Sequence, residues 1–492
     1  MSGLYAAIEH VARTRAGATA FELGDEGSVD FATLLGRIER MGAALASQGV
    51  RPGDRVTVQV EKSLDNVVVY LATLRQGAAY VPLNTGYTDA ELEYFITDAQ
   101  PRVVVVEPER VDAVQASTSK TTITTLDALT RAVPAVVPPR ADRANSDLAA
   151  IVYTSGTTGR SKGAMLSHGN LLANAHTLVD QWGFSADDIL VHALPLYHVH
   201  GLFVALHCAL LAGARTRLLP RFDAASAVAA LRGASVFMGV PTYYTRLLAD
   251  PAFPGRGVDL RLWISGSAPL LPETFAEFER RVGARILERY GMSEAGMITS
   301  NPLRGERRAG TVGAPLPGVE VRVRDSEGRI VPAGSPGVLE IRGPNVFSGY
   351  WRNEEKTRQS FTADGFFVTG DVVVVDASGT VSIVGREKDL IISGGLNVYP
   401  REIEAEIDTL PGVRESAVVG VSHPDFGEGV IAVVDRRASG PDEAAVIAAL
   451  RGRLAAFKLP KRVFFVDELP RNAMGKVQKN VLRARYADTF RA

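Results

Sequence analysis

Short apolar runs rich in β-branched residues alternate with stretches of helical spacing along much of the chain. Residues 55–60 look like a strand, residues 102–106 have the composition of a strand buried on both faces, and residues 64–76 show helical spacing. Such strand–helix–strand repetition is typical of mostly parallel sheets covered by helices. We therefore predict an α/β protein with a large N-terminal domain of parallel-rich sheets flanked by helices.

The spacing of glycine and proline changes at about residue 312. Short strands between Gly/Pro turns predict a β-rich subdomain over residues 312–387, within a large domain that spans residues 1–387. Residues 388–492 have the pattern of a small α+β domain, with helices expected over residues 400–410 and 441–454. A chain of 492 residues is too long for one compact core, which agrees with this division.

Composition excludes several classes of partner. A net charge of −1 gives no reason to expect a nucleic acid or an anionic membrane surface as partner. The chain has no apolar run of membrane-spanning length, and residues 1–15 lack the apolar core of a signal peptide. The single cysteine, Cys208, lies in an apolar run, so we expect a buried small side chain and a reducing, cytoplasmic location.

The first chemical motif is a polar loop at residues 153–163, directly after the apolar run of residues 148–152. Its glycines permit close approach of a ligand, and its N–H groups, hydroxyls and Lys162 suit a polyphosphate. The Walker A spacing requires Gly-Lys-Ser/Thr five residues after the first glycine, where this chain has Ser161 and Lys162. This loop is therefore not a Walker A motif, and taken alone a plain polar turn stays an alternative.

Six further segments follow the loop in a fixed order, and with it they resemble the signatures of the acyl-adenylate-forming superfamily. This superfamily contains acyl-CoA synthetases, adenylation domains of peptide synthetases and luciferases. The segments lie at residues 196–201, 266–269, 288–294, 369–371, 385–389 and 470–476. Residues 194–203 and 238–247 look most similar to the malonyl-CoA synthetase branch.

The resemblance implies a ligase that uses ATP, Mg²⁺ and coenzyme A. A carboxylic acid would first form an acyl-adenylate with release of diphosphate, and the CoA thiol would then displace AMP. Tyr290 would pack on the adenine, Asp371 would accept hydrogen bonds from the ribose, and Glu294 would ligate Mg²⁺. By the resemblance the ATP- and AMP-binding residues are Thr154, Ser155, Gly156, Thr157, Thr158, Gly159, Lys162, Gly266, Ser267, Ala268, Pro269, Glu288, Tyr290, Gly291, Met292, Ser293, Asp371 and Arg386.

The resemblance also assigns roles to the C-terminal residues. Lys476, expected on an exposed loop, would be the catalytic cation that reaches the α-phosphate and the attacking carboxylate. Lys388 stands at the position of the family's hinge, about which the small domain rotates between the two half-reactions. Ser393, Gly394 and Gly395 would line the tunnel for the pantetheine arm of CoA.

Arg289 is the residue that points to a particular acid. A dicarboxylate such as malonate brings a second charge into a dry pocket, and arginine offers it a rigid two-pronged partner. In the alternative reading, Arg289 contacts a phosphate or Glu288. His198, with the catalytic residues Lys476 and Glu294, would act near the reacting carboxyl. The expected acyl-binding residues are Arg289, His198, Val199, His200 and Met297, of which Val199 and Met297 would set the tolerance for methylmalonate.

Three other functions compete with malonate activation. An ordinary short- or medium-chain monocarboxylate acyl-CoA synthetase would share every motif except the need for Arg289. A free-standing adenylation enzyme that loads a carrier protein would share the site chemistry. A catalytically inactive adenylate-binding protein is disfavoured because Lys476, Glu294 and Asp371 are all present.

Overall fold

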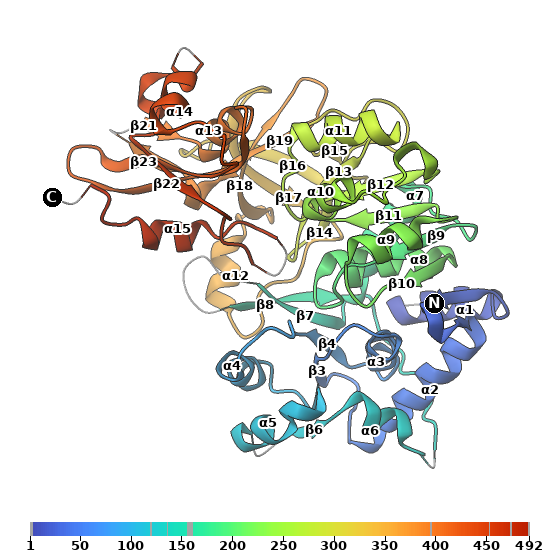
Figure 1. Ribbon diagram of the computed structural model, residues 1–492. Helices are drawn as coiled ribbons and strands as arrows, with labels where there is room; N and C mark the ends of the chain where they lie inside the picture. The colour runs from blue at the N-terminus through green and yellow to red at the C-terminus, as the bar shows by residue number, and fades with distance from the viewer. Residues whose placement is uncertain are drawn as a thin grey trace. The chain divides into compact units, whose positions relative to one another are not determined.

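The computed structural model describes residues 3–118, 121–134, 136–154, 161–393, 396–451, 453–472 and 475–490. The chain divides into two compact units (Figure 1). The first unit comprises Met1–Ala309, Gly313–Glu320 and Ile341–Phe367, and the second comprises Gly310–Val312, Val321–Glu340 and Val368–Ala492. Most of the β-rich region thus groups with the C-terminal segment, and the domain boundary at Lys388 stays a prediction.

One sheet of the first unit has six strands, all parallel except the pair β7–β8. In sheet order the strands are β6 (Thr122–Thr124), β5 (Val103–Val106), β3 (Arg55–Gln59), β4 (Ala79–Pro82), β7 (Leu148–Thr154) and β8 (Lys162–Ser167). Strand β5 is made of four valines that are all fully buried, as expected for a strand covered on both faces.

The second sheet of this unit has nine strands, with a parallel centre and antiparallel edges. In sheet order they are β15 (Ala314–Pro315), β14 (Gly296–Ser300), β13 (Leu287–Met292), β12 (Leu262–Ser265), β11 (Val236–Gly239), β9 (Ile189–His192), β10 (Arg215–Leu218), β1 (Thr19–Glu22) and β2 (Ser28–Asp30). Ligands of parallel sheets bind beyond the carboxyl ends of the strands. Strands β9 and β12 end directly before the predicted acyl and nucleotide segments.

Helices cover these sheets and begin at recognisable caps. Thr88 and Glu91 form a capping box at the start of α4, and Ser167 and Asn170 form another at the start of α7. The helices of the first unit are α1 (Leu4–Thr14), α2 (Phe31–Ser47), α3 (Leu64–Arg75), α4 (Asp89–Ala99), α5 (Val111–Ser117), α6 (Leu126–Arg131), α7 (His168–Gln181), α8 (Leu206–Ala212), α9 (Ala224–Leu231), α10 (Pro241–Ala249), α11 (Pro272–Val282) and α12 (Glu354–Ser360).

The second unit holds two smaller sheets. The four-stranded sheet runs β16 (Glu320–Arg324), β17 (Pro336–Arg342), β18 (Phe367–Val375) and β19 (Val381–Arg386). The five-stranded sheet runs β21 (Leu396–Val398), β20 (Ile391–Ser393), β23 (Gly427–Arg436) and β22 (Val413–His423), with β24 (Arg462–Val466) paired to β23. Its helices are α13 (Pro400–Ile407), α14 (Glu443–Leu450) and α15 (Lys479–Arg485).

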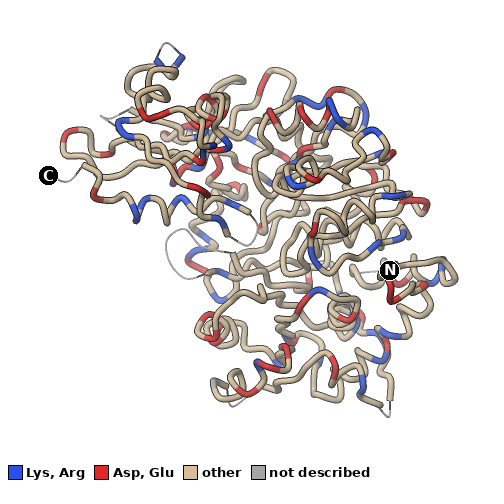
Figure 2. The backbone as a smooth tube through the Cα atoms, viewed as in Figure 1, with Lys and Arg blue, Asp and Glu red and all other residues tan. Residues whose placement is uncertain are grey.

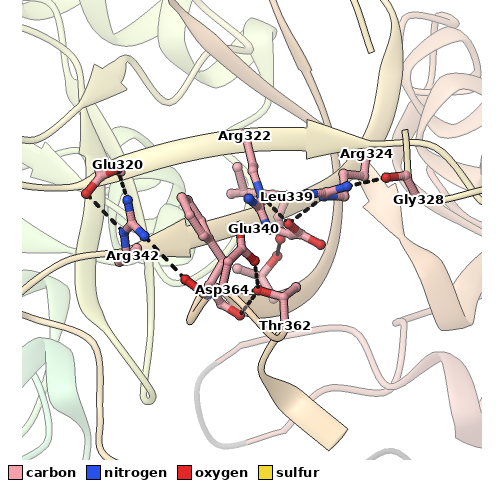
Figure 3. A network of polar contacts seen from close by, with 11 residues as sticks. Glu320, Arg322, Arg324, Gly328, Leu339, Glu340, Arg342, Thr362 and Asp364 are labelled. Atoms are coloured by element: carbon pink, nitrogen blue, oxygen red, sulfur yellow. Dashed lines mark hydrogen bonds and ion pairs between the residues drawn. The ribbon is translucent and has the colours of Figure 1, made fainter. Parts of the chain in front are cut away.

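Charge pairing strengthens the four-stranded sheet. The Nε atoms of Arg322 and Arg324 lie 2.5 and 2.9 Å from Oε2 of Glu340, whose carboxylate lies between the two neighbouring strands (Figure 3). Cross-strand pairs of opposite charge are favourable, and a buried carboxylate needs such partners. The buried Glu340 therefore helps to fix the register of β16 against β17.

Charged residues of both signs are spread along the described chain (Figure 2). Lysine and arginine residues are interspersed with acidic residues along the backbone in both units (Figure 2), in keeping with the net charge of −1. Within the described part of the chain, no helix is long and apolar enough to cross a membrane. The α/β fold class predicted from the sequence is confirmed, and Cys208 is buried as expected.

Candidate active site

The antiparallel strands β7 and β8 flank the predicted phosphate loop. Thr154 ends β7 opposite Lys162, which begins β8, while Ser155, Gly156, Thr157, Thr158 and Gly159 lie outside the described residues. The Lys162 ammonium lies 6.0 Å from the centre of the Tyr350 ring, within cation–π range. Burial, followed by the charge of Lys356, lowers the pKa of Lys162, and the nearby Glu294 carboxylate opposes this shift.

Glu294 is the carboxylate of this cluster. It is buried, and the hydroxyl of Tyr350 donates a hydrogen bond of 3.0 Å to its Oε1. Burial and the adjacent carboxylate raise the pKa of Tyr350, so its hydroxyl stays protonated and donates at neutral pH. A buried carboxylate next to a phosphate-binding segment is the oxygen ligand that Mg²⁺ prefers. Sequence reasoning missed Tyr350, whose partner Glu294 lies 56 residues earlier in the chain.

Arg289 is buried on β13, with only 2% of its surface exposed. Among the described residues, no hydrogen-bond partner is found for its buried Nε and Nη2 atoms. The guanidinium packs against the backbone of Gly266, where a Cβ atom would lie 2.3 Å from Nη1. Burial lowers the pKa of Arg289 to about 10, so the group is still a cation at neutral pH.

The charge of Glu288, the alternative partner of Arg289, opposes the lowering of the Arg289 pKa, and Glu288 also makes two other hydrogen bonds. Its Oε1 accepts a hydrogen bond of 3.1 Å from the backbone N–H of Leu270, which follows the predicted adenine segment. Its backbone carbonyl accepts a bond of 2.9 Å from the Asn301 side chain. Glu288 therefore holds the loop after β12 in place.

The nucleotide segment joins the acyl segment through one polar contact. Ser267 has a left-handed backbone (φ 72°), and its Oγ lies 3.2 Å from Nδ1 of His200. Tyr290 is buried beside this region on β13. Gly291 is required by close packing, because a Cβ there would lie 2.2 Å from the Gly296 carbonyl oxygen. The remaining predicted nucleotide residues Ala268, Pro269, Met292 and Ser293 lie on the same two segments and are partly or fully exposed.

His200 lies in an electropositive environment. It is buried, and no partner for its Nε2 is found in the described chain. Burial, followed by the charges of Arg289, His192 and His198, lowers the pKa of His200 far below its ordinary value. The charges of Arg289 and His198, both predicted acyl residues, therefore act on His200, and the assignment of all three to the acyl pocket stays a prediction. Val199 and Met297 are both buried, and Met297 exchanges two backbone hydrogen bonds with the Asn174 side chain.

Lys62, which follows β3 of the six-stranded sheet, and His192, which ends β9, support the acyl segment, and sequence reasoning missed both. The Lys62 ammonium donates to the backbone oxygen of His192 at 2.7 Å and to its Nδ1 at 2.9 Å. The other ring nitrogen of His192 lies 2.9 Å from the Gly201 carbonyl oxygen and donates to it. Gly201 is tightly packed, since a Cβ there would lie 2.1 Å from the Pro195 oxygen.

In the second unit, Asp371 and Arg386 form an ion pair across β18 and β19. They face each other in the strand register, with 2.8 Å between Arg386 Nε and Asp371 Oδ1. The Asp371 side chain is 3% exposed and that of Arg386 is 40% exposed, so the carboxylate is buried while the guanidinium reaches the surface. Thr369, two residues earlier, accepts a bond from the Asp371 N–H and donates one to the Leu339 carbonyl.

The other C-terminal residues lie at the expected kinds of position. Lys388 lies in a short 3₁₀ turn (Glu387–Asp389), and burial, followed by Arg386, lowers its pKa. Ser393 is buried at the end of β20, whereas Gly394 and Gly395 lie outside the described residues. Lys476 is exposed on a loop, as predicted.

The chain belongs to the AMP-binding enzyme family. The family model for AMP-binding enzymes matches residues 8–351, and that for the AMP-binding enzyme C-terminal domain matches residues 402–476. Both matches agree with the superfamily resemblance.

Individual members of the family are similar along most of the chain. The crystal structure of ATP-bound MatB from Rhodopseudomonas palustris is 50% identical, with a TM-score of 0.94 over 98% of this chain and 100% of that one. A malonate–CoA ligase from Arabidopsis thaliana is 34% identical over 88% of this chain and 78% of its own length. A feruloyl-CoA synthase from Amycolatopsis is 35% identical over 97% of this chain and 96% of its own length.

Proposed function

We propose that this protein ligates malonate to coenzyme A through a malonyl-adenylate and releases AMP and diphosphate. The observation that carries this proposal is Arg289, a buried cation with two N–H groups that no described residue accepts. A buried charged group whose N–H donors have no acceptor costs free energy. A ligand that accepts hydrogen bonds from both Nε and Nη2 of Arg289 is therefore strongly favoured. A carboxylate matches the two-pronged geometry of a guanidinium.

Malonate is a short dicarboxylic acid that meets this requirement. One carboxylate has to reach the nucleotide for adenylation, and the second has to meet Arg289, which lies against Gly266 of the nucleotide segment. The neighbouring His200 and Ser265 each have a buried polar atom without a partner among the described residues. A monocarboxylate would leave the guanidinium and these atoms unpaired. Buried Val199 and Met297 would limit a C2 substituent and so set the tolerance for methylmalonate.

The nucleotide would be bound by the residues that carry the family signatures. We assign the phosphates to the loop from Thr154 to Lys162, the adenine to Tyr290 and the segment from Gly266 to Pro269, and the ribose to Asp371 and Arg386. Glu294, positioned by Tyr350, would hold Mg²⁺, which would neutralise charge on the phosphates. His198 would lie near the reacting carboxyl.

The C-terminal residues would serve the two half-reactions in turn. Lys476 would supply the positive charge for adenylation, where charge develops on the α-phosphate and the attacking carboxylate. Lys388 would be the hinge between a large domain of residues 1–387 and a small domain of residues 388–492. Ser393, Gly394 and Gly395 would line the pantetheine tunnel in the second step. A buried single cysteine supports a cytoplasmic location.

The test separates the two steps. With ATP, Mg²⁺ and no CoA, malonate should drive exchange of labelled diphosphate into ATP, and the addition of CoA should then release AMP and malonyl-CoA in equal amounts. Exchange that occurs with malonate but without thioester formation would favour a carrier-loading enzyme. No exchange with malonate, but exchange with ferulate or butyrate, would refute the assignment of the acid.

A further inference from the structure

Lys476 lies in a small hairpin between β24 and α15. The ends of the hairpin pair through Arg471 and Val477, and the backbone N–H of Asn472 bonds to the Lys476 carbonyl at 2.9 Å. The N–H of Lys476 in turn bonds to the Asn472 side chain at 3.0 Å. These bonds shape the turn itself, but a turn on the surface needs further contacts to fix its direction.

Charged contacts anchor the hairpin on both sides within the second unit. On the first side, Arg471 forms an ion pair with Glu415 of β22 and donates a bond of 2.6 Å to the Gly475 carbonyl. On the second side, the Lys479 ammonium lies 2.5 Å from Oε1 of Glu404 on α13. Lys479 is the first residue of α15 and stands three residues after Lys476.

The Glu404–Lys479 pair is a buried junction. The Glu404 side chain is 6% exposed and that of Lys479 is 19% exposed. The same oxygen of Glu404 accepts a bond of 2.8 Å from the Val418 N–H of β22. One carboxylate thus joins α13, β22 and the start of α15. Buried pairs of this kind fix geometry more than they add stability, because desolvation offsets much of their attraction.

We propose that the buried Glu404–Lys479 ion pair is a positioning device that fixes the start of α15 and thereby the direction from which Lys476 reaches the site. Glu404 and Lys479 are positioning residues, because they act on the reaction only through Lys476. This inference rests on the proposed function, since it assigns a role within the adenylation step. It predicts that weakening the pair lowers the rate of adenylation and leaves the rate of thioester formation unchanged.

A second ion pair on the same helix provides a matched control. Lys458 lies 2.5 Å from Glu402 Oε1, the same distance as in the Glu404 pair, and both carboxylates belong to α13. Lys458, however, lies in a separate 3₁₀ turn (Ala456–Lys458), and no described contact links it to the hairpin or to α15. The Lys458→Met variant loses a charge pair of the same length, with a more exposed carboxylate, without touching the hairpin.

The experiment measures both half-reactions in four variants. For Lys479→Met we expect diphosphate exchange to fall about 10- to 100-fold, the scale of a misplacement of about 1 Å, while thioester formation from supplied malonyl-adenylate stays within about twofold. Lys479→Arg, which keeps the charge, should recover most of the exchange. Lys458→Met should match the wild type in both assays. If Lys479→Met does not fold, Glu404→Gln keeps an acceptor for the Val418 N–H and tests the same claim.

Two outcomes would overturn the inference. One is unchanged exchange in a folded Lys479→Met or Glu404→Gln variant. The other is an equal loss in both half-reactions that tracks a lower melting temperature, which would show a general structural role. The wild type is assayed first with several acids, and the variants are compared on whichever acid it adenylates. A wrong acid assignment therefore leaves this test intact.

Discussion

Replacing Arg289 by methionine removes the proposed partner of the second carboxylate while keeping a long side chain in the pocket. Loss of one partner from a buried charge pair costs about 2–5 kcal/mol, which corresponds to a fall of about 30- to 5,000-fold in kcat/KM for malonate. The kcat/KM for butyrate, which has no second carboxylate, should rise or stay the same. AMP release with CoA, ATP and Mg²⁺ measures both values.

The stability of the ligand-free protein should not fall with the activity. Because Nε and Nη2 of Arg289 have no partner in the described chain, methionine removes a desolvated cation without breaking a hydrogen bond of either atom. The free energy of unfolding of the ligand-free protein should therefore stay equal or rise, by up to about 3 kcal/mol. Malonate should raise the melting temperature of the wild type but not of the variant.

Either of two results would refute this reasoning. If malonate kcat/KM changes less than about threefold in the Arg289→Met variant, the guanidinium does not bind the second carboxylate. If the ligand-free variant is strongly destabilised, Arg289 has a structural role with a partner in the protein. Arg289→Lys serves as the control, because it keeps the charge but loses the fork and should give an intermediate fall.

Three further predictions address other parts of the molecule. Lys476→Ala should abolish diphosphate exchange but leave thioester formation from supplied malonyl-adenylate largely intact, and a parallel loss of both rates would contradict its role. Tyr350→Phe removes the 3.0 Å bond to Glu294 and should raise the Mg²⁺ concentration for half-maximal rate several-fold; an unchanged Mg²⁺ titration would remove Tyr350 from the metal site. Burial, followed by Glu404, raises the pKa of Asp408 to about 7 from an ordinary value of 3.8, so the folded state keeps a proton that the unfolded chain releases, and stability should fall as pH rises from about 4 to 7. Asp408→Asn should then raise the free energy of unfolding by about 1–4 kcal/mol at pH 8 and change it little at pH 4, and urea titrations that show no such pH dependence would refute the shift.

The fold class could be predicted because its signals are local. The valine run of β5 and the helical spacing of α3 identify elements whose burial follows from composition alone. Helix ends were less predictable. The pattern over residues 400–410 predicted a longer helix than α13, which ends at Ile407 just before the turn at Leu410 to Val413. Capping by Asp442 likewise starts α14 two residues after the predicted beginning.

The candidate site could be predicted only where a residue carries chemistry within a motif. Arg289, Glu294 and Lys476 were proposed because each lies in a segment that resembles a family signature. Lys62 and Tyr350 could not be found in this way, because their partners are 130 and 56 residues away in the sequence. Such supporting contacts depend on how the sheets pack, which no local pattern specifies.

The most direct test of the central claim is a comparison of kcat/KM for malonate, methylmalonate, acetate and butyrate in the CoA-dependent release of AMP. A pocket built around the Arg289 cation predicts that malonate exceeds both monocarboxylates by about a hundredfold or more, equivalent to roughly 2.7 kcal/mol. A monocarboxylate that equals or exceeds malonate would contradict it.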